Sequence, residues 1–235
     1  MDRVALITGG SSGIGLAIAR MLREEGFALT LASRRRERVE AAAEELGAYA
    51  VAFDAADGAA CERLVAEHGE RFGRLDMLVN SAGIGVAGTV DQLSPKHFDL
   101  QVGVNLRGLF LVTRASIPLL RESRGWIVNL ASIAGTLPTP GLATYGATKA
   151  AVISLTRSLN EELDSDGVRA VALCPGFVDT PMAEWSGLAS EEMITPEDCA
   201  EIVRMLLRLS PRARVPQIVI ERAGSTSGDV PLGGA

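Results

Sequence analysis

Aromatic side chains are scarce in this chain. Phe, Trp and Tyr make up 4% of its 235 residues, although 47% of the residues are hydrophobic. The core must therefore be built mainly from Ala, Val, Leu and Ile. The length is enough for one domain with a large core. Because no linker or internal repeat divides the sequence, we expect residues 1–235 to form a single domain.

Cysteine and histidine are also rare. The three cysteines, Cys61, Cys174 and Cys199, include no Cys-x-x-Cys pair, a pattern that favours free thiols in a reducing compartment. The two histidines, His68 and His97, lie far apart and lack the spacing of metal ligands. We therefore expect no metal site.

Long apolar runs and an excess of positive charge are missing as well. No segment approaches the roughly 20 apolar residues that span a bilayer, and the apolar run near the N-terminus is too short for a signal peptide. The net charge of −6 gives no electrostatic reason to expect nucleic acid or a membrane as partner. A soluble cytoplasmic protein is expected.

What the chain does contain is a regular alternation of short apolar runs with segments of helical spacing. The runs that predict strands are residues 4–7, 28–32, 48–53, 77–80, 126–131, 169–174 and 216–220. The helical segments are residues 16–22, 36–46, 58–72, 102–120, 144–163 and 195–209. This alternation predicts an α/β fold with a parallel sheet covered on both faces. Ligands of such folds bind at the carboxyl ends of the strands, where the sequence places Gly9, Ser33, Asp54, Asn80 and Ser132.

A glycine-rich turn follows the first predicted strand. Gly9, Gly13 and Gly15, with Ser11 and Ser12 between them, precede a helical segment. Glycines there let the backbone approach a pyrophosphate, which the free N–H groups at the start of the helix can bind. The spacing G-x-x-x-G-x-G differs from the common G-x-G-x-x-G, and an ordinary strand–helix turn is the alternative. We favour the phosphate-binding turn.

The end of the second predicted strand bears on the choice between NAD and NADP. An acidic residue at this position would bind the ribose 2′-hydroxyl of NAD, whereas an Arg accommodates the 2′-phosphate of NADP. Ser33 and Arg34 stand here, followed by Arg35 and Arg36. For the last two we favour the solvated start of a helix. For Arg34, with Ser33, we favour recognition of the 2′-phosphate.

Tyr145 and Lys149 are four residues apart, so they share one face of a helix. A neighbouring ammonium lowers the ordinary Tyr pKa of about 10 and makes the phenol a usable acid and base. Ser132, at the end of a buried strand, could bind a substrate oxygen beside it. Such spacing also arises by chance in a helix with one aromatic anchor and one solvated Lys.

Asn105 lies in an apolar helical pattern and needs a partner, either in the core or at a site where it holds water or a Lys.

Residues 181–195 carry Met182, Trp185 and other apolar side chains without a clean period. They could form a mobile lid over an apolar pocket or a packed surface segment. The segment contains Glu184, Glu191 and Glu192, and we find no cationic clamp for a substrate carboxylate. Residues 224–235 are rich in Gly and Ser and predict a loose tail.

Taken together, the motifs resemble those of the short-chain dehydrogenase/reductase family. The matching residues, in the family's order, are Thr8-Gly9-x3-Gly13-Ile14-Gly15, Asn80-Ser-Ala82-Gly83, Asn105, Ser132, Tyr145-x3-Lys149 and Pro175-Gly176-x3-Thr180. The resemblance covers nearly everything from residue 3 to about residue 220. It implies a single-domain Rossmann fold, with a doubly wound parallel sheet of about seven strands. It also implies hydride transfer between a nicotinamide and a small carbonyl compound or secondary alcohol.

Carried onto the matching positions, the resemblance implies a role for each candidate catalytic residue. Tyr145 is the acid/base that protonates the carbonyl oxygen, and Lys149 lowers its pKa and binds the nicotinamide ribose. Ser132 orients the substrate oxygen, and Asn105 holds a water that links Lys149 to solvent. A 3-oxoacyl thioester, a simple ketone or aldehyde, and a hydroxy acid all remain open as substrates.

The resemblance also implies the cofactor contacts. Asn80 fixes the central sheet near the cofactor ribose, Ile14 and Thr180 contact the nicotinamide side, and Asp54 contacts the adenine. The whole cofactor-binding set that we expect is Gly9, Ser11, Ser12, Gly13, Ile14, Gly15, Ser33, Arg34, Asp54, Asn80, Ala82, Gly83, Tyr145, Lys149, Pro175, Gly176 and Thr180.

The preferred interpretation is an NADP-dependent oxidoreductase. An NAD-dependent alcohol dehydrogenase of the same family is one alternative, and a non-catalytic NADP-binding regulatory protein is another. A homodimer or homotetramer is expected, with residues 102–120 and 144–163 as the helix pair that forms the dimer. Ala147, Ala150 and Ala151 would allow close packing there.

Overall fold

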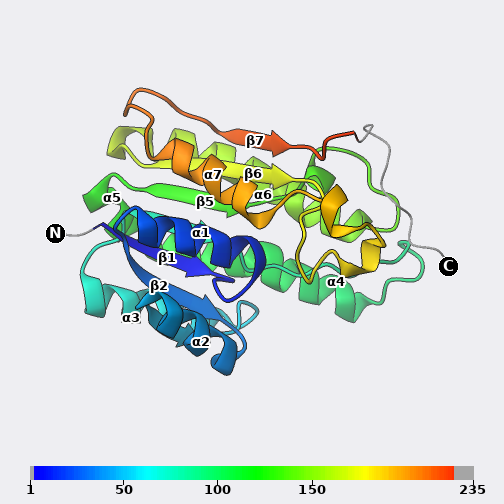
Figure 1. Ribbon diagram of the computed structural model, residues 1–235, viewed down its shortest axis with the longest axis horizontal. Helices are drawn as coiled ribbons and strands as arrows, with labels where there is room; N and C mark the ends of the chain where they lie inside the picture. The colour runs from blue at the N-terminus through cyan, green and yellow to red at the C-terminus, as the bar shows by residue number, and fades with distance from the viewer. Residues whose placement is uncertain (1–2, 225–235) are drawn as a thin grey trace.

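A computed structural model describes residues 3–224 of the chain and confirms the predicted α/β fold. Seven parallel strands form one sheet in the order β3-β2-β1-β4-β5-β6-β7 (Figure 1). The order reverses at β1, which is typical of a doubly wound sheet, and ligands bind at such a switch point. The strands are β1 (Val4–Thr8), β2 (Ala28–Ser33), β3 (Tyr49–Ala52), β4 (Met77–Asn80), β5 (Trp126–Leu130), β6 (Arg169–Pro175) and β7 (Gln217–Ile220).

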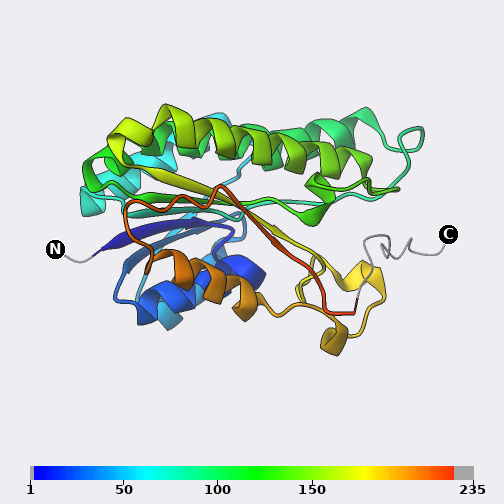
Figure 2. The same ribbon diagram turned by 90° about the horizontal axis from the view of Figure 1, so that it is seen from above.

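The helices cover the two faces of the sheet in separate layers (Figure 2). One layer consists of α1 (Gly13–Glu24), α2 (Arg36–Leu46) and α7 (Pro196–Leu206). The opposite layer consists of α3 (Gly58–Phe72), α4 (Pro95–Val102), α5 (Leu109–Ser123) and α6 (Ala143–Glu162). Within residues 3–224, no helix has the length and apolar character needed to cross a membrane.

The core described consists of three apolar clusters, one under α1, α2 and α7 and two on the opposite face of the sheet. Every residue of β1, β4 and β5 is buried, because helices cover both faces and the strands read as continuous apolar runs. Ile7 and Val79 belong to the cluster under α1, α2 and α7, whereas Leu6 and Leu78 belong to the cluster under α3 and α5. Alternate side chains of each strand therefore serve opposite layers.

The predicted helix at residues 102–120 is the later part of a longer helical stretch, which begins after the capping residue Ser94 and ends at Ser123. The chain is helical without a break from α4 to α5, with a π-helical segment, Gly103–Gly108, between them. The buried face of this stretch carries the polar residues Gln101 and Asn105. They interrupt the periodic spacing of apolar residues that indicates a helix in the sequence. π-helical segments often occur at functional sites, and this one carries Asn105.

Other boundaries differ by a few residues. Helix α7 ends at Leu206 rather than at 209, because the chain continues in tighter turns such as Arg208 N–H to Met205 C=O. The third strand is limited to Tyr49–Ala52. Residue 224 is the last one described, so the predicted tail, residues 224–235, lies almost entirely outside the described residues.

A buried polar network ties the centre of the sheet to two helices. The Asn80 amide on β4 donates to Asn129 Oδ1 on β5 and to Thr113 Oγ1 on α5, both at 2.9 Å. Asn129 in turn donates to Thr156 Oγ1 on α6 at 2.9 Å. Low local dielectric strengthens such bonds and makes an unpaired member costly. The network therefore fixes how the carboxyl-terminal half of β4 sits against α5 and α6.

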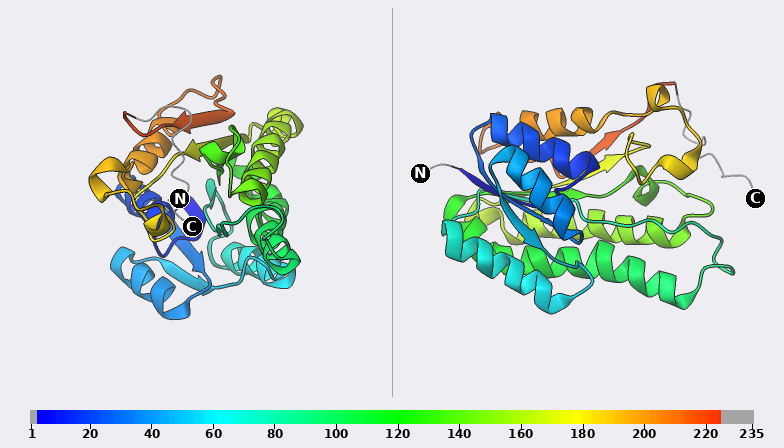
Figure 3. Two further views of the ribbon diagram at one scale, coloured as in Figure 1. Left: turned by 90° about the vertical axis from the view of Figure 1, so that its right-hand side faces the viewer. Right: turned by 60° about the horizontal axis from the view of Figure 1, so that its bottom comes forward.

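The left view in Figure 3 looks onto the edge of the sheet where the strands end. Loops from both halves of the sheet converge at this edge. Since the strands are parallel, all seven carboxyl ends lie here, and the edge is the expected position of a ligand site.

The start of α5 packs against the loop before α3 without any space for a side chain. A Cβ atom on Gly108 would overlap the carbonyl oxygen of Ala55, and the backbone of Gly108 is otherwise helical, at φ −61°. Gly108→Ala is therefore expected to lower the free energy of unfolding by about 2 kcal/mol, as overpacked substitutions do. Urea denaturation measures the change.

Gly69→Ala in α3 is the matched control. Its Cβ atom would meet only a Leu119 side-chain carbon, at 3.7 Å, so the higher helix propensity of Ala should raise the free energy of unfolding by up to about 1 kcal/mol. Equal effects of the two substitutions would contradict the close contact at Gly108.

Candidate active site

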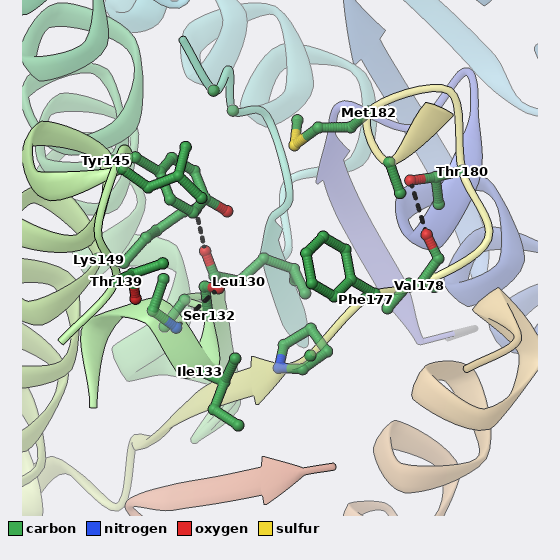
Figure 4. Close-up of a pocket in the computed structure, with 18 of the residues that line it drawn as sticks. Leu130, Ser132, Ile133, Thr139, Tyr145, Lys149, Phe177, Val178, Thr180 and Met182 are labelled. Carbon is green, nitrogen blue, oxygen red and sulfur yellow. Dashed lines mark hydrogen bonds between the residues drawn. The ribbon is translucent and has the colours of Figure 1, made fainter. Parts of the chain in front are cut away.

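A cavity of about 500 Å³ opens at the carboxyl ends of β4, β5 and β6. Figure 4 shows Ser132, Tyr145 and Lys149 on one side of it and Phe177, Thr180 and Met182 on the other. Its wall contains eight of the residues that the sequence predicts for the site: Ile14, Gly83, Ser132, Tyr145, Lys149, Pro175, Gly176 and Thr180. Asn80 lies just behind it, next to the lining residue Ser81.

Tyr145 lies in the first turn of α6, partly buried, with its hydroxyl near Ser132. Burial raises the pKa of the phenol above its ordinary value, and a hydrogen bond with Ser132 partly offsets this. The expected lowering of the Tyr145 pKa by Lys149 is therefore wrong, because loss of hydration outweighs any charge effect. At neutral pH the group is a phenol, which can donate a proton.

Lys149 lies beneath Tyr145 with 5% of its surface exposed. Its ammonium donates to the carbonyl oxygen of Leu130, at the end of β5, at 2.6 Å. It stands 5.6 Å from the centre of the Tyr145 ring. Burial lowers the pKa of Lys149 to about 8, because the charged amine loses its hydration. The amine can therefore gain or lose a proton close to neutral pH.

Ser132 begins a short turn, Ile133–Gly135, directly after β5. Its side chain accepts a hydrogen bond from the Ala134 N–H at 3.2 Å, which leaves the hydroxyl proton available for the Tyr145 oxygen or a substrate oxygen. The turn packs tightly on α6, since a Cβ atom on Gly135 would come within 2.7 Å of the Lys149 backbone. This close contact fixes Ser132 relative to α6.

Asn105 lies behind the cavity, fully buried in the π-helical segment. Its amide donates to the Ile84 carbonyl at 2.9 Å and to Thr148 Oγ1 at 3.2 Å, and its oxygen accepts from the Ile84 N–H at 2.8 Å. Both amide protons are thus engaged with the protein. A Cβ atom on Gly83 would lie 3.5 Å from Asn105 Oδ1 and 3.6 Å from Lys149 Nζ, so Gly83 lies beside both groups.

Two residues of this region escaped the sequence analysis. Thr148 connects Asn105 to the carbonyl oxygen of Tyr145, to which it donates at 2.7 Å. Gln101, one helical turn before Asn105, accepts from the Val86 N–H at 3.1 Å. Together Gln101 and Asn105 hold the backbone that lines the cavity after β4. Their four-residue spacing on one helix face was the signal that could have revealed them as a pair.

The glycine turn lies at the end of β1 with the geometry of a phosphate cradle. Gly9 and Gly13 have φ values of +68° and +51°, which favour glycine. A Cβ atom on Gly9 would stand 2.8 Å from the Ala82 N, and one on Gly15 would overlap the Gly9 carbonyl. Ser12 makes no side-chain cap bond, and the first turn of α1 has no acidic residue. The positive end of α1 can therefore bind an anion beside this turn.

Ser33, Arg34 and Asp54 lie together at the ends of β2 and β3, away from the cavity wall. The Ser33 hydroxyl is buried and has no hydrogen-bond partner in the described part of the chain, a feature that calls for a ligand or water. Arg34 is exposed. The Asp54 carboxylate accepts from the Ala56 N–H at 2.9 Å and is exposed to solvent.

The remaining predicted residues join the glycine turn to the cavity. Ala82 donates its N–H to Thr8 Oγ1 at 3.2 Å. Gly176 donates to the Ile220 carbonyl at 2.8 Å, which ties the end of β6 to β7. Thr180 reaches the glycine turn, because a Cβ atom on Gly13 would lie 2.9 Å from its methyl group. Segments far apart in sequence thus meet where a dinucleotide would lie.

Two charged residues in the cavity wall, Glu221 and Arg222, were not foreseen. Arg222, just after β7, lines the cavity, with its side chain 17% exposed and its guanidinium 3.9 Å from Glu192. Arg222 is thus a cation of the cavity wall that lies outside residues 181–195, the segment in which no cationic clamp for a carboxylate was found. The position of Arg222 beyond a strand end was the available signal, since the other site residues follow strands in the same way. Among residues 3–224, no group of His, Cys, Asp and Glu side chains could hold a metal ion.

The residues present fit a nicotinamide dinucleotide. The glycine turn leaves no room for side chains where a pyrophosphate would approach. The Ser33 hydroxyl, which has no partner among the described residues, lies at the end of β2, where the adenosine ribose of a dinucleotide would bind. Tyr145 and Lys149 line the cavity at the other end of this path.

Comparisons with known proteins agree with this geometry. A family model described as short chain dehydrogenase matches residues 3–189. An uncharacterised oxidoreductase of Staphylococcus epidermidis is 35% identical over 222 residues, which cover 93% of this chain and 96% of the relative.

Two solved structures are similar to the chain over nearly its whole length. An alcohol dehydrogenase from the archaeon Thermococcus sibiricus, complexed with 5-hydroxy-NADP, is 33% identical with a TM-score of 0.89, covering 95% of this chain and 98% of that one. A 3-ketoacyl-(acyl-carrier-protein) reductase from Brucella melitensis, complexed with NADH, is 33% identical with a TM-score of 0.84, covering 93% and 96%.

The buried amine of Lys149 is expected to destabilise the fold at neutral pH. A pKa lowered from 10.5 to about 8 corresponds to about 3 kcal/mol. Between these two pH values the unfolded chain holds a proton that the folded chain has released, so stability rises with pH. Lys149→Met should therefore be more stable than the wild type at pH 7, and the difference should shrink as pH rises to 10.5. Urea denaturation across this range measures it.

The other lysine of the chain, Lys96, is exposed and provides the matched control. Lys96→Met should show no pH-dependent difference from the wild type. If Lys149→Met is less stable than the wild type at pH 7, or if the difference does not change with pH, the amine is not held in the buried state described.

Proposed function

This chain belongs to the short-chain dehydrogenase family, and we propose that it reduces a small ketone or aldehyde with NADPH. The convergence of Ser132, Tyr145 and Lys149 in one cavity beside a glycine cradle is the observation that carries this proposal. Members of the family are oxidoreductases, and a nicotinamide cofactor is supported by the NADP analogue and the NADH in the two similar structures.

Tyr145 donates the proton in the proposed reaction. Its pKa is raised by burial, so the phenol is protonated at neutral pH and can protonate a carbonyl oxygen. Ser132, which shares a hydrogen bond with Tyr145, holds the same oxygen from the other side. When bound, the nicotinamide supplies the hydride that reaches the carbonyl carbon.

Lys149 restores the proton to Tyr145 and binds the nicotinamide ribose. A pKa of about 8 allows the amine to exchange protons near neutral pH. Asn105 and Thr148 position α6 against the loop after β4, through the hydrogen bonds of the Asn105 amide. The water that Asn105 was expected to hold stays a prediction of this mechanism.

The proposed cofactor contacts follow the path from the β2 end to the cavity. Ser33 and Arg34 bind the 2′-phosphate, and Asp54 contacts the adenine. The α1 start binds the pyrophosphate. The further contacts are made by Gly9, Ser11, Ser12, Gly13, Ile14, Gly15, Asn80, Ala82, Gly83, Pro175, Gly176 and Thr180. The unpartnered hydroxyl of Ser33 and the cation beside it support NADP over NAD.

Residues 181–195 act as a substrate lid in this proposal. They contribute Met182 and Trp185 to the cavity wall. A parallel bridge between Val178 and Ile194 anchors the segment where it leaves and rejoins the domain. The residues between these anchor points form short turns and can move relative to them.

A homodimer through the outer faces of α5 and α6 is also proposed. The Phe110 side chain on α5 is 46% exposed, and the small residues Ala147 and Ala150 are exposed on α6. An apolar face with small residues beside it permits close helix packing between two copies.

Tyr145→Phe is expected to lower kcat by at least about a thousandfold, since it removes the general acid. Binding of NADPH should be unchanged because the ring remains. The decrease of NADPH absorbance with time measures turnover, and calorimetry measures cofactor binding. The chain's other tyrosine, Tyr49, serves as control: Tyr49→Phe should leave kcat unaltered. Turnover by Tyr145→Phe close to that of the wild type would exclude the proposed role.

Arg34→Ala should weaken NADPH binding about 10- to 100-fold, the loss expected for a hydrogen bond to a charged group. Binding of NADH, which lacks the 2′-phosphate, should change little. The neighbouring variant Arg35→Ala removes the same charge one residue away and should affect neither. Equal binding of NADH and NADPH by the wild type, with no effect of Arg34→Ala, would instead support an NAD-dependent enzyme.

A further inference from the structure

The cavity wall opposite the catalytic side chains is apolar. Figure 4 shows Phe177 and Met182 across from Tyr145 and Ser132. Trp185, Leu137 and Leu142 add further apolar surface to the cavity. Leu137, Met182 and Trp185 are 37%, 44% and 45% exposed. Large apolar side chains left exposed around a cavity mark a surface that an apolar ligand covers.

Two aromatic rings form the centre of this wall. Phe177 and Trp185 meet edge to face, with ring centres 5.9 Å apart and an interplanar angle of 67°. Phe177 directly follows Gly176 at the end of β6, whereas Trp185 is carried by the segment 181–195. The pair therefore connects the sheet to the proposed lid, and the rings offer a ready contact for a flat apolar group.

The charges near the cavity do not favour an anionic substrate. Apart from Lys149, the charged residues in its described wall are Glu221 and Arg222. Arg222 already faces the Glu192 carboxylate at 3.9 Å. A substrate carboxylate would compete with Glu192 for this guanidinium and would lose hydration against an apolar wall.

We propose that the substrate is an uncharged ketone or aldehyde that carries a flat apolar group, and that Trp185 with Phe177 determines this specificity. This inference rests on the proposed carbonyl reduction. The carbonyl oxygen lies between Ser132 and Tyr145, and the apolar group lies against the aromatic pair, under residues 181–195.

Matched ketones test the substrate class. Acetophenone, methyl 4-acetylbenzoate and 4-acetylbenzoate share one aryl ketone, and the last two differ in charge. Calorimetry with the NADPH complex of Tyr145→Phe measures binding without turnover, and kcat/KM of the wild type gives the kinetic counterpart. We expect the two neutral ketones to bind at least tenfold more tightly than the carboxylate.

Variants of the wall test the specificity residue. Trp185→Ala should weaken acetophenone binding about tenfold, with a smaller loss for acetone, which has no ring, and Trp185→Phe should retain most of the affinity. Met205→Ala, which removes an apolar side chain of similar exposure, 42%, on α7, should have no effect. Parallel circular dichroism spectra show that each variant is folded.

The proposal is overturned if 4-acetylbenzoate binds more tightly than its methyl ester and Arg222→Met abolishes this preference. Arg222 would then be an anion receptor. Equal losses for acetophenone and acetone in Trp185→Ala would also overturn it. If the aryl ketones bind as expected but the wild type reduces none of them, the proposed reaction fails while the assignment of an apolar, uncharged ligand stands.

Discussion

A single buried ammonium determines how this site is built. Lys149 donates to the Leu130 carbonyl at the end of β5, and so ties α6 to the edge of the sheet where ligands bind. A charge in this position requires partners and costs stability, which the pKa of about 8 reflects. Tyr145, one turn earlier on α6, is thereby held over the amine and beside Ser132. Functional sites commonly carry such unfavourable groups.

Amide side chains hold the frame around this ammonium. Asn80 and Asn129 join the two central strands to the helices on one face, while Gln101 and Asn105 hold the loop after β4 by its backbone. In each set, side-chain amides bind fixed partners, although Asn80 Oδ1 and Gln101 Nε2 have none among the described residues. Such bonds rigidify a structure more than apolar contacts alone. The site can therefore keep its geometry although one wall consists of a segment proposed to move.

The sequence predicted the features that depend on local pattern. Strands buried on both faces read as continuous apolar runs, and strand ends such as Ser132 then identify the ligand edge without further information. The helix around Gln101 lacks a clear apolar period because its inward residues are polar. The pKa of Tyr145 depends on burial, which spacing alone does not give. Arg222 follows a predicted strand, but only the pairing of β7 with β6 brings it to the cavity.

The central claim is that Tyr145 and Lys149 serve hydride transfer to a carbonyl carbon. The most direct test supplies NADPH carrying deuterium at the transferable C4 position, together with acetophenone, and analyses the alcohol by mass spectrometry. The account predicts an alcohol heavier by one mass unit, with the deuterium on the former carbonyl carbon, and none from Tyr145→Phe. An alcohol formed without the label, or labelled equally by Tyr145→Phe, would contradict it.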